Sequence, residues 1–206
     1  KPTVFVVDGF SSGNRYAELL VQRGYRVAHI QSALTVPDHF AKTFREDDYD
    51  EEFIFDGNLD KLVQKIKAQR PIAVFTGADS GVELGDRIRA ALGLPNNDPA
   101  LTAVRRSKFL TNEHLRSQGI PAAEDLLTDN LDAGIRWIRE TNHDRLPVMV
   151  KQEAGAGTEM VFTCFNQQEV ETAFRTIYGS VGKHGNVNSK VLFEEFLNGT
   201  EYVVNT

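Results

Sequence analysis

The sequence predicts an α/β protein in two parts: a parallel sheet with helices on its faces, then a region of α+β character. Over residues 1–95, short β-branched or aromatic runs alternate with helical patterns, as in parallel sheets joined by crossover helices. Over residues 96–206, some neighbouring strand-like runs are close enough to form hairpins. The two parts meet near a loop at 94–99 that contains two prolines and two asparagines.

In the first part, we expect strands at 3–8, 25–30, 53–55 and 71–76, and helices at 14–23, 59–69 and 81–92. The helix at 59–69 is amphipathic, since its apolar side chains recur at helical spacing. The loop at 9–13, after the first strand, is interpreted as a structural turn, with phosphate binding as the alternative. Asp79 or Ser80 is expected to cap the third helix.

In the second part, we expect helices at 100–106, 108–118, 131–141 and 167–178. Strands are expected at 123–127, 147–151, 160–165, 190–196 and 201–205. The strand at 147–151 should pair with the one at 160–165 through the intervening loop. Asn166 is expected to cap the helix that follows it, with Glu169 completing a capping box.

The composition is that of a globular protein without a membrane span. In 206 residues, 23 Lys and Arg against 29 Asp and Glu give a net charge of −6, which disfavours nonspecific binding to nucleic acid. No apolar run approaches the roughly 18 residues that span a bilayer. The single cysteine, Cys164, excludes an internal disulfide and is expected in the core. No secretion signal is recognised, so a cytoplasmic location is expected.

A lysine followed by a loop of small residues indicates phosphate binding. Lys151 ends a predicted strand, and the loop after it contains Ala154, Gly155, Ala156, Gly157 and Thr158. Backbone N–H groups in such a loop, together with a lysine ammonium, can surround phosphate oxygens. The alternative is a plain hairpin with a flexible loop.

A second group of residues fits an adenine nucleotide. Glu194 and Glu195 lie in a predicted strand and therefore face opposite sides, so that one can enter a cleft. A carboxylate there can bind the amine of adenine, Leu197 can cover the base, and Glu201 can accept hydrogen bonds from ribose hydroxyls. The alternative is an amphipathic hairpin with glutamates at the surface.

Taken in order, these motifs resemble the ATP-grasp superfamily of carboxylate–amine ligases. Lys108, the phrase Gly119-Ile120-Pro121, Lys151, the glycine loop and the stretch 194–201 follow the family's order over essentially the whole chain. The resemblance is greatest to the L-amino-acid ligase and biotin-carboxylase-like branch. It implies a pre-ATP-grasp, Rossmann-like parallel-sheet domain at 1–95 and an incomplete α+β ATP-grasp domain at 96–206.

The resemblance also implies a role for each site residue. Lys108 and Lys151 would contact the α- and β-phosphates, and the loop 154–158 would close over them. Glu194 would accept from the adenine amine, and Glu201 would hold the ribose. The backbone of the intervening residues would contact the edge of the base: Glu195, Phe196 and Leu197.

The implied cofactors are ATP and Mg²⁺, and the implied substrates are a small carboxylate and an amine that form an amide through an acyl phosphate. Because the family's metal ligands lie downstream of the ribose glutamate, we expect them beyond Thr206. We therefore expect this chain to be inactive by itself, and its parent to be an enzyme that can form a homodimer.

Two alternatives remain: a noncatalytic nucleotide-binding module, and a dinucleotide-binding oxidoreductase domain. The second is disfavoured because the loop at 9–13 lacks the G-x-G-x-x-G pattern. In addition, Gln31 stands where an acidic ribose ligand would be.

Overall fold

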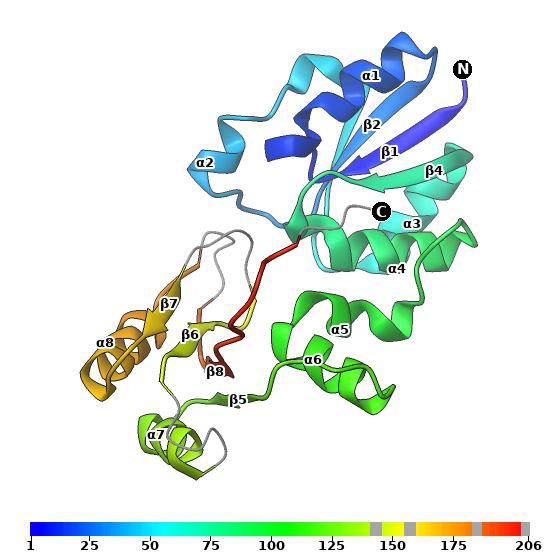
Figure 1. Ribbon diagram of the computed structural model, residues 1–206. Coiled ribbons are helices and arrows are strands. Elements are labelled where there is room, and N and C mark those ends of the chain that lie inside the picture. Colours follow the sequence, from blue (N-terminus) through cyan, green and yellow to red (C-terminus); the bar gives the residue numbers. More distant parts are fainter. Residues whose placement is uncertain (141–145, 155–159, 183–186, 203–206) are drawn as a thin grey trace. The chain divides into compact units, whose positions relative to one another are not determined.

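The computed structural model describes residues 1–140, 146–154, 160–182 and 187–202, and it divides into two compact units, Lys1–Ala103 and Val104–Thr206 (Figure 1). The sequence placed the division after residue 95. The units divide later because residues 96–103 are bonded to helix α4 (Val82–Leu92). Asn96 Nδ2 donates to the Asp86 carbonyl at 2.9 Å, and Thr102 Oγ1 donates to Asp86 Oδ2 at 2.7 Å.

The first unit is built on a four-stranded parallel sheet in the order β3-β2-β1-β4. Its strands are β1 (Thr3–Val7), β2 (Arg26–Gln31), β3 (Glu51–Ile54) and β4 (Pro71–Thr76). Every residue of β1 is buried, which is typical of a central parallel strand covered on both faces. The parallel sheet expected from the sequence is therefore confirmed.

Helices cover both faces of this sheet (Figure 1). Side chains alternate along β1, so that Val6 packs with Ala17 of α1 (Tyr16–Gln22), while Phe5 and Val7 face the other side. That side packs against α3 (Leu59–Ala68) and α4. The short elements are α2 (Asp38–Ala41), η1 (Ser11–Arg15), η2 (Glu46–Asp48), η3 (Asp79–Gly81) and η4 (Pro99–Leu101), and α5 (Thr102–Arg106) crosses the division between units.

The second unit is built on an antiparallel sheet in the order β5-β8-β6-β7. Its elements are α6 (Lys108–Ser117), β5 (Asp125–Thr128), α7 (Leu131–Glu140), β6 (Val148–Gln152), β7 (Val161–Cys164), α8 (Gln167–Ile177) and β8 (Val191–Glu195). The predicted pairing of β6 with β7 is confirmed. Of the strand predicted at 201–205, Glu201 and Tyr202 lie in coil, and the remainder falls outside the described residues.

One face of the antiparallel sheet forms the core of the second unit. Val148 and Val150 of β6 and Val191 and Phe193 of β8 pack with side chains of α7 and α8. Cys164 belongs to this core, and its burial raises the pKa of the thiol to about 11. The expectation of a core cysteine is therefore confirmed.

The two predicted helix caps have different outcomes. Asn166 caps α8 as expected, since its side chain accepts from the Glu169 N–H at 2.9 Å. Neither Asp79 nor Ser80 caps α4, which begins at Val82 and has Gly81 at its N-cap position without a side-chain cap. Ser80 Oγ instead donates to the buried Asp8 carboxylate at 2.5 Å, which ties the end of β4 to the end of β1.

His29 is fully buried in the first unit and lies between two partners. Its Nε2 accepts from the Gly9 N–H at 3.1 Å, and its Nδ1 lies 2.9 Å from Glu52 Oε1. A proton on Nε2 would oppose the Gly9 N–H, so the ring is neutral with its proton on Nδ1. Burial lowers the pKa of His29 below its usual value, although the neighbouring carboxylates of Glu52 and Asp8 oppose that shift.

Among the described residues, none of the helices is both long enough and apolar enough to cross a bilayer.

We predict that the stability of the first unit decreases as the pH falls below about 6.5, the usual pKa of histidine. The unfolded chain takes up a proton on His29 before the folded chain does, so the unfolded state is favoured at low pH. Urea titrations at pH 7 and pH 5 measure this decrease. The exposed His39→Gln control should keep it, and His29→Gln should lose much of it. An equal decrease in both variants would contradict the prediction.

We predict that Gly134→Ala destabilises the second unit by about 1–3 kcal/mol. A Cβ at Gly134 of α7 would lie 2.2 Å from the ring of Phe193, so the helix or strand β8 would have to move. Thermal unfolding measures the loss. Gly199→Ala is the control, because a Cβ there meets no heavy atom within 4 Å. Equal stability of the two variants would refute this packing.

Candidate functional site

Lys151 and Glu194 meet on the sheet face that points away from α7 and α8. Val150 of β6 and Phe193 of β8 face the core. Because side chains alternate along strands, their neighbours Lys151 and Glu194 lie on the opposite face. Lys151 is paired in register with Leu192, and Glu194 with Met149, so Lys151 and Glu194 are diagonal neighbours. Lys151 Nζ lies 2.5 Å from Glu194 Oε1, and the two side chains are 15% and 14% exposed.

A second pair of charges adjoins the first. Asp125 of β5 is paired in register with Glu194 of β8, and its side chain is fully buried. Arg116 of α6 donates to Asp125 Oδ1 at 2.6 Å. Two carboxylates opposite each other on adjacent strands repel unless something separates or neutralises them.

Asn112 of α6 provides that separation. Its Nδ2 donates to Asp125 Oδ2 at 2.8 Å and to Glu194 Oε2 at 3.2 Å. The charges therefore alternate across the face: the Arg116 cation, the Asp125 carboxylate, the Asn112 amide, the Glu194 carboxylate and the Lys151 cation.

The beginning of α6 places Lys108 beside the end of β6. Ser107 caps the helix by accepting from the Leu110 N–H at 3.2 Å, and its Oγ donates to Glu153 Oε1 at 2.6 Å. Lys108 Nζ donates to the Glu153 carbonyl at 3.4 Å. Lys108 is therefore held next to Ala154, where the predicted phosphate loop begins. Its residues Gly155, Ala156, Gly157 and Thr158 lie outside the described residues.

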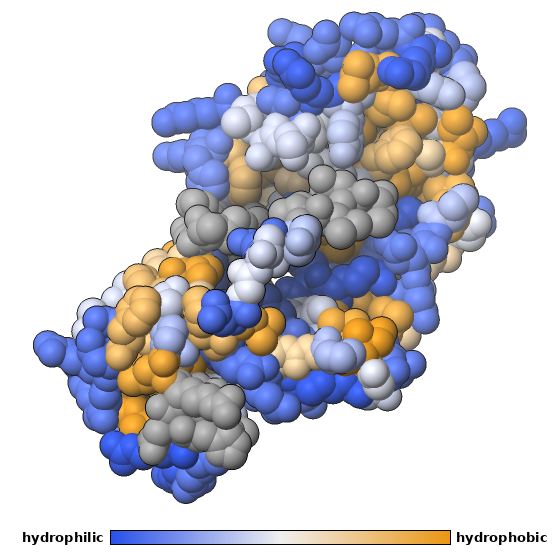
Figure 2. All heavy atoms as spheres, in the orientation of Figure 1, coloured by the Kyte–Doolittle hydropathy of each residue, from blue (hydrophilic) through white to orange (hydrophobic). Residues whose placement is uncertain are grey.

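Glu194 and Glu195, the last two residues of β8, lie on opposite faces of the sheet. Glu195 points away from Glu194, and its Oε1 accepts from the Glu124 N–H at 3.0 Å. Phe196 and Leu197 follow the strand and are 42% and 69% exposed, and Glu201 lies in exposed coil. Figure 2 shows apolar side chains at the surface of this unit among mainly hydrophilic ones.

Among residues 1–140, 146–154, 160–182 and 187–202, no three His, Cys, Asp or Glu side chains come together in a way that could hold a metal ion. The metal ligands stay a prediction.

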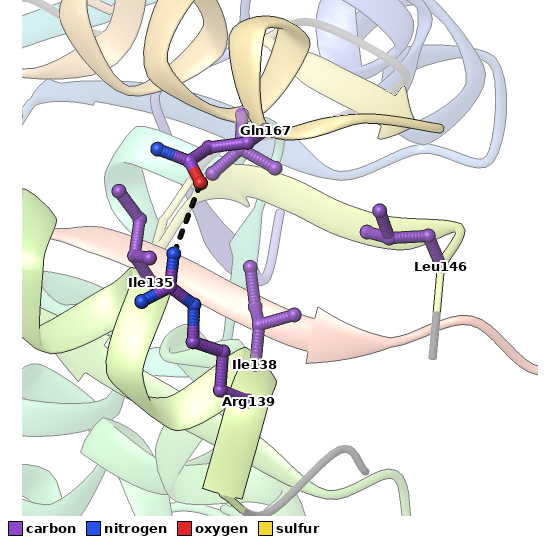
Figure 3. Close-up of a pocket in the computed structure, with 6 residues that line it drawn as sticks. Ile135, Ile138, Arg139, Leu146 and Gln167 are labelled. Carbon is purple, nitrogen blue, oxygen red and sulfur yellow. Dashed lines mark hydrogen bonds between the residues drawn. The ribbon is translucent and has the colours of Figure 1, made fainter. Parts of the chain in front are cut away.

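A separate small pocket lies between the beginning of α8 and the last turns of α7 (Figure 3). Its apolar wall comes from residues of both helices, and Arg139 donates to Gln167 Oε1 at 3.2 Å across it. Its volume is about 90 Å³, far below the several hundred Å³ typical of sites for drug-sized ligands. We therefore do not assign a ligand to it.

The residues of α6 and β5 that support Glu194 were not predicted from the sequence, namely Asn112, Arg116 and Asp125. One signal was available: Asn112 and Arg116 follow Lys108 at intervals of four, so all three lie on one side of a helix. The neighbour of that helix side could not be identified, because β5 pairs with β8 across more than 60 residues of sequence.

The chain is similar in sequence to a synthase, and in structure to a ligase and to a carboxylase domain. It is 30% identical, over its full length, to dapdiamide A synthase of Enterobacter agglomerans, of which it covers 48%. The structure of an L-amino acid ligase from Bacillus licheniformis matches 97% of the chain with a TM-score of 0.69 at 15% identity, and the chain covers 47% of it.

A third match is the biotin carboxylase domain of 2-oxoglutarate carboxylase from Hydrogenobacter thermophilus, a dimer in complex with MgADP. It covers 94% of the chain with a TM-score of 0.64 at 16% identity, and the chain covers 44% of it. The chain thus spans about half the length of each of these three proteins. No family model matches the sequence.

We predict that Asp125→Asn destabilises the second unit by about 3 kcal/mol, since it removes one partner of a buried ion pair and leaves the Arg116 cation without it. Chemical denaturation measures the loss. Glu113→Gln is the matched control: Glu113 contacts the same arginine from the solvent side, and its side chain is 55% exposed. The control should lose no more than about 1 kcal/mol. If Asp125→Asn loses no more than the control, the buried pair is not what holds α6 to β5.

Proposed function

Because the chain is related to the ATP-grasp carboxylate–amine ligases and matches their N-terminal portion, we propose that its second unit binds ATP at the Lys151–Glu194 face. We further propose that the whole protein is an ATP-dependent ligase that joins a carboxylate to an amine. One observation supports this most strongly: Lys151 and Glu194, which lie 43 positions apart and were each predicted from the sequence to bind a nucleotide, form one ion pair.

In the structure, Lys151 and Glu194 are each other's partners. A nucleotide offers each of them another partner. The phosphates attract the Lys151 ammonium, and the 6-amino group of adenine donates to the Glu194 carboxylate. Because both side chains are largely buried, each needs a partner in the complex as well. Lys151 would gain anionic phosphate oxygens, and Glu194 would exchange a cation for a neutral hydrogen-bond donor.

The remaining site residues extend this arrangement in both directions. Lys108, tethered at the Glu153 carbonyl, would supply a second cation to the phosphates, and the loop that begins at Ala154 would close over them. At the other end, Leu197 would cover the base, the backbone of Glu195, Phe196 and Leu197 would contact its edge, and Glu201 would hold the ribose.

The reaction would proceed in two steps. A substrate carboxylate oxygen attacks the γ-phosphorus of ATP, the bond to the bridging oxygen breaks, and ADP and an acyl phosphate form. The amine nitrogen then attacks the acyl carbon, inorganic phosphate leaves, and the amide forms as the amine loses a proton. Lys108 and Lys151 position and neutralise the phosphates, and none of the named residues acts as a covalent nucleophile. Bound Mg²⁺ would further neutralise the phosphate oxygens.

The substrates are proposed to be a small-molecule carboxylate and a small-molecule amine. We propose that the protein has no nucleic-acid or membrane partner and acts in the cytoplasm. A homodimer is supported by the dimeric biotin carboxylase domain to which the chain is similar. We expect the 206-residue polypeptide to bind nucleotide without completing a ligation.

We predict that the chain binds ADP, and that Lys151→Met and Glu194→Gln each weaken binding by at least about tenfold, since each removes a charge-assisted contact with the ligand. Isothermal titration calorimetry with MgADP measures this. Lys190→Met and Glu171→Gln are matched controls, since Lys190 is an exposed lysine just before β8 and Glu171 lies on α8, which covers the opposite face.

Binding that is unchanged in the Lys151 and Glu194 variants would reject the proposed site. Binding by the chain without ligation, even in a version extended to the length of its relatives, would favour a noncatalytic nucleotide-binding module. Binding of a nicotinamide dinucleotide at the loop 9–13, without effect of the Lys151 variant, would favour the oxidoreductase alternative.

A further inference from the structure

We propose that Asn112 is a positioning residue, anchored by Asp125 and Arg116, that holds the Glu194 carboxylate where it selects a 6-amino purine over a 6-oxo purine. The inference rests on the proposed nucleotide site and adds to it the residue that sets its base specificity. Asn112 does not contact the base in this account, and its effect passes through Glu194.

The orientation of the Asn112 amide follows from its surroundings. Both of its partners are carboxylate oxygens, at 2.8 Å and 3.2 Å, and a carboxylate can only accept. The side chain must therefore present its NH₂ group to both, because the rotated amide would aim its own oxygen at two negative charges. The amide has one productive orientation, and each of its two hydrogens has a defined partner.

The anchor of this amide is rigid. The Asp125 side chain is fully buried, accepts from Arg116 on one oxygen and from Asn112 on the other, and lies in the sheet directly opposite Glu194. Arg116 also donates to the Ala123 carbonyl, which fixes its guanidinium against the chain that enters β5. Asn112 thereby fixes one oxygen of Glu194 relative to β5 and α6.

This anchor matters most when the nucleotide is bound. Before binding, Glu194 is held on Oε1 by Lys151 and on Oε2 by Asn112. When the phosphates attract Lys151, the contact on Oε1 is lost, and Asn112 keeps the carboxylate oriented with Oε1 toward the base. Adenine presents a 6-amino donor to that oxygen. Hypoxanthine presents a 6-oxo group, whose oxygen the fixed carboxylate repels.

ADP and IDP test this inference, because their bases differ at position 6 and at the adjacent ring nitrogen. We expect wild-type chain to bind MgADP at least about tenfold more tightly than MgIDP in calorimetry. In Asn112→Leu, the ADP-to-IDP ratio of affinities should fall at least about fivefold, since the charged Glu194 carboxylate loses a hydrogen-bond donor and can turn away from the base. Asn112→Ala should behave likewise and creates no overpacking.

The matched control is Glu113→Gln, on the next position of α6, which contacts Arg116 and should leave the ratio unchanged. Circular dichroism and thermal melting establish that each variant is folded. A merely structural role for Asn112 predicts that both nucleotides weaken equally. An unchanged ratio in either folded variant therefore overturns the inference alone, whereas failure of wild-type chain to bind ADP overturns the nucleotide site and the inference with it.

Discussion

The antiparallel register between β6 and β8 is the constraint on which the rest of the candidate site depends. It places Val148, Val150 and Phe193 on the face covered by α7 and α8, and alternation then places Lys151 and Glu194 together on the other face. A slip of one residue in either strand would put a charge into the core. The hydrophobic energy that stabilises the unit is thus also what holds the ion pair in place.

The same sheet explains why the site contains more charges than the proposed nucleotide contacts require. Placing β5 beside β8 brings Asp125 opposite Glu194, and two buried carboxylates at that distance are unfavourable unless cations and donors accompany them. Helix α6 supplies an arginine and an asparagine to this pair, while its beginning, capped by Ser107, brings Lys108 to the end of β6. One helix thus contributes residues to both the proposed base end and the proposed phosphate end.

The sequence predicted those parts of the structure that depend on local pattern. Alternating and helical periodicities located the parallel sheet and the β6–β7 hairpin, and the short polar signature at Asn166 identified a true cap. Lys151 and Glu194 were found because each lies in a recognisable motif. Whether the individual residues bind nucleotide remains a prediction, since the comparisons bear on family and fold.

What the sequence could not predict depends on contacts between distant segments. Asp125 and Asn112 became part of the site only through the pairing of β5 with β8. The expected cap at Asp79 or Ser80 was wrong because a tertiary partner, the buried Asp8 carboxylate, binds the Ser80 hydroxyl. The boundary at residue 95 was displaced for a similar reason, since Asp86 of α4 binds both Asn96 and Thr102.

A crystal structure of the chain with ADP tests the central claim most directly. The account predicts that the Lys151–Glu194 ion pair opens, with the lysine ammonium at the phosphates and the Glu194 carboxylate within hydrogen-bond distance of the 6-amino group of adenine. Asn112 should still donate to Glu194 in that complex. An ADP bound elsewhere, with the Lys151–Glu194 pair intact, would contradict the account.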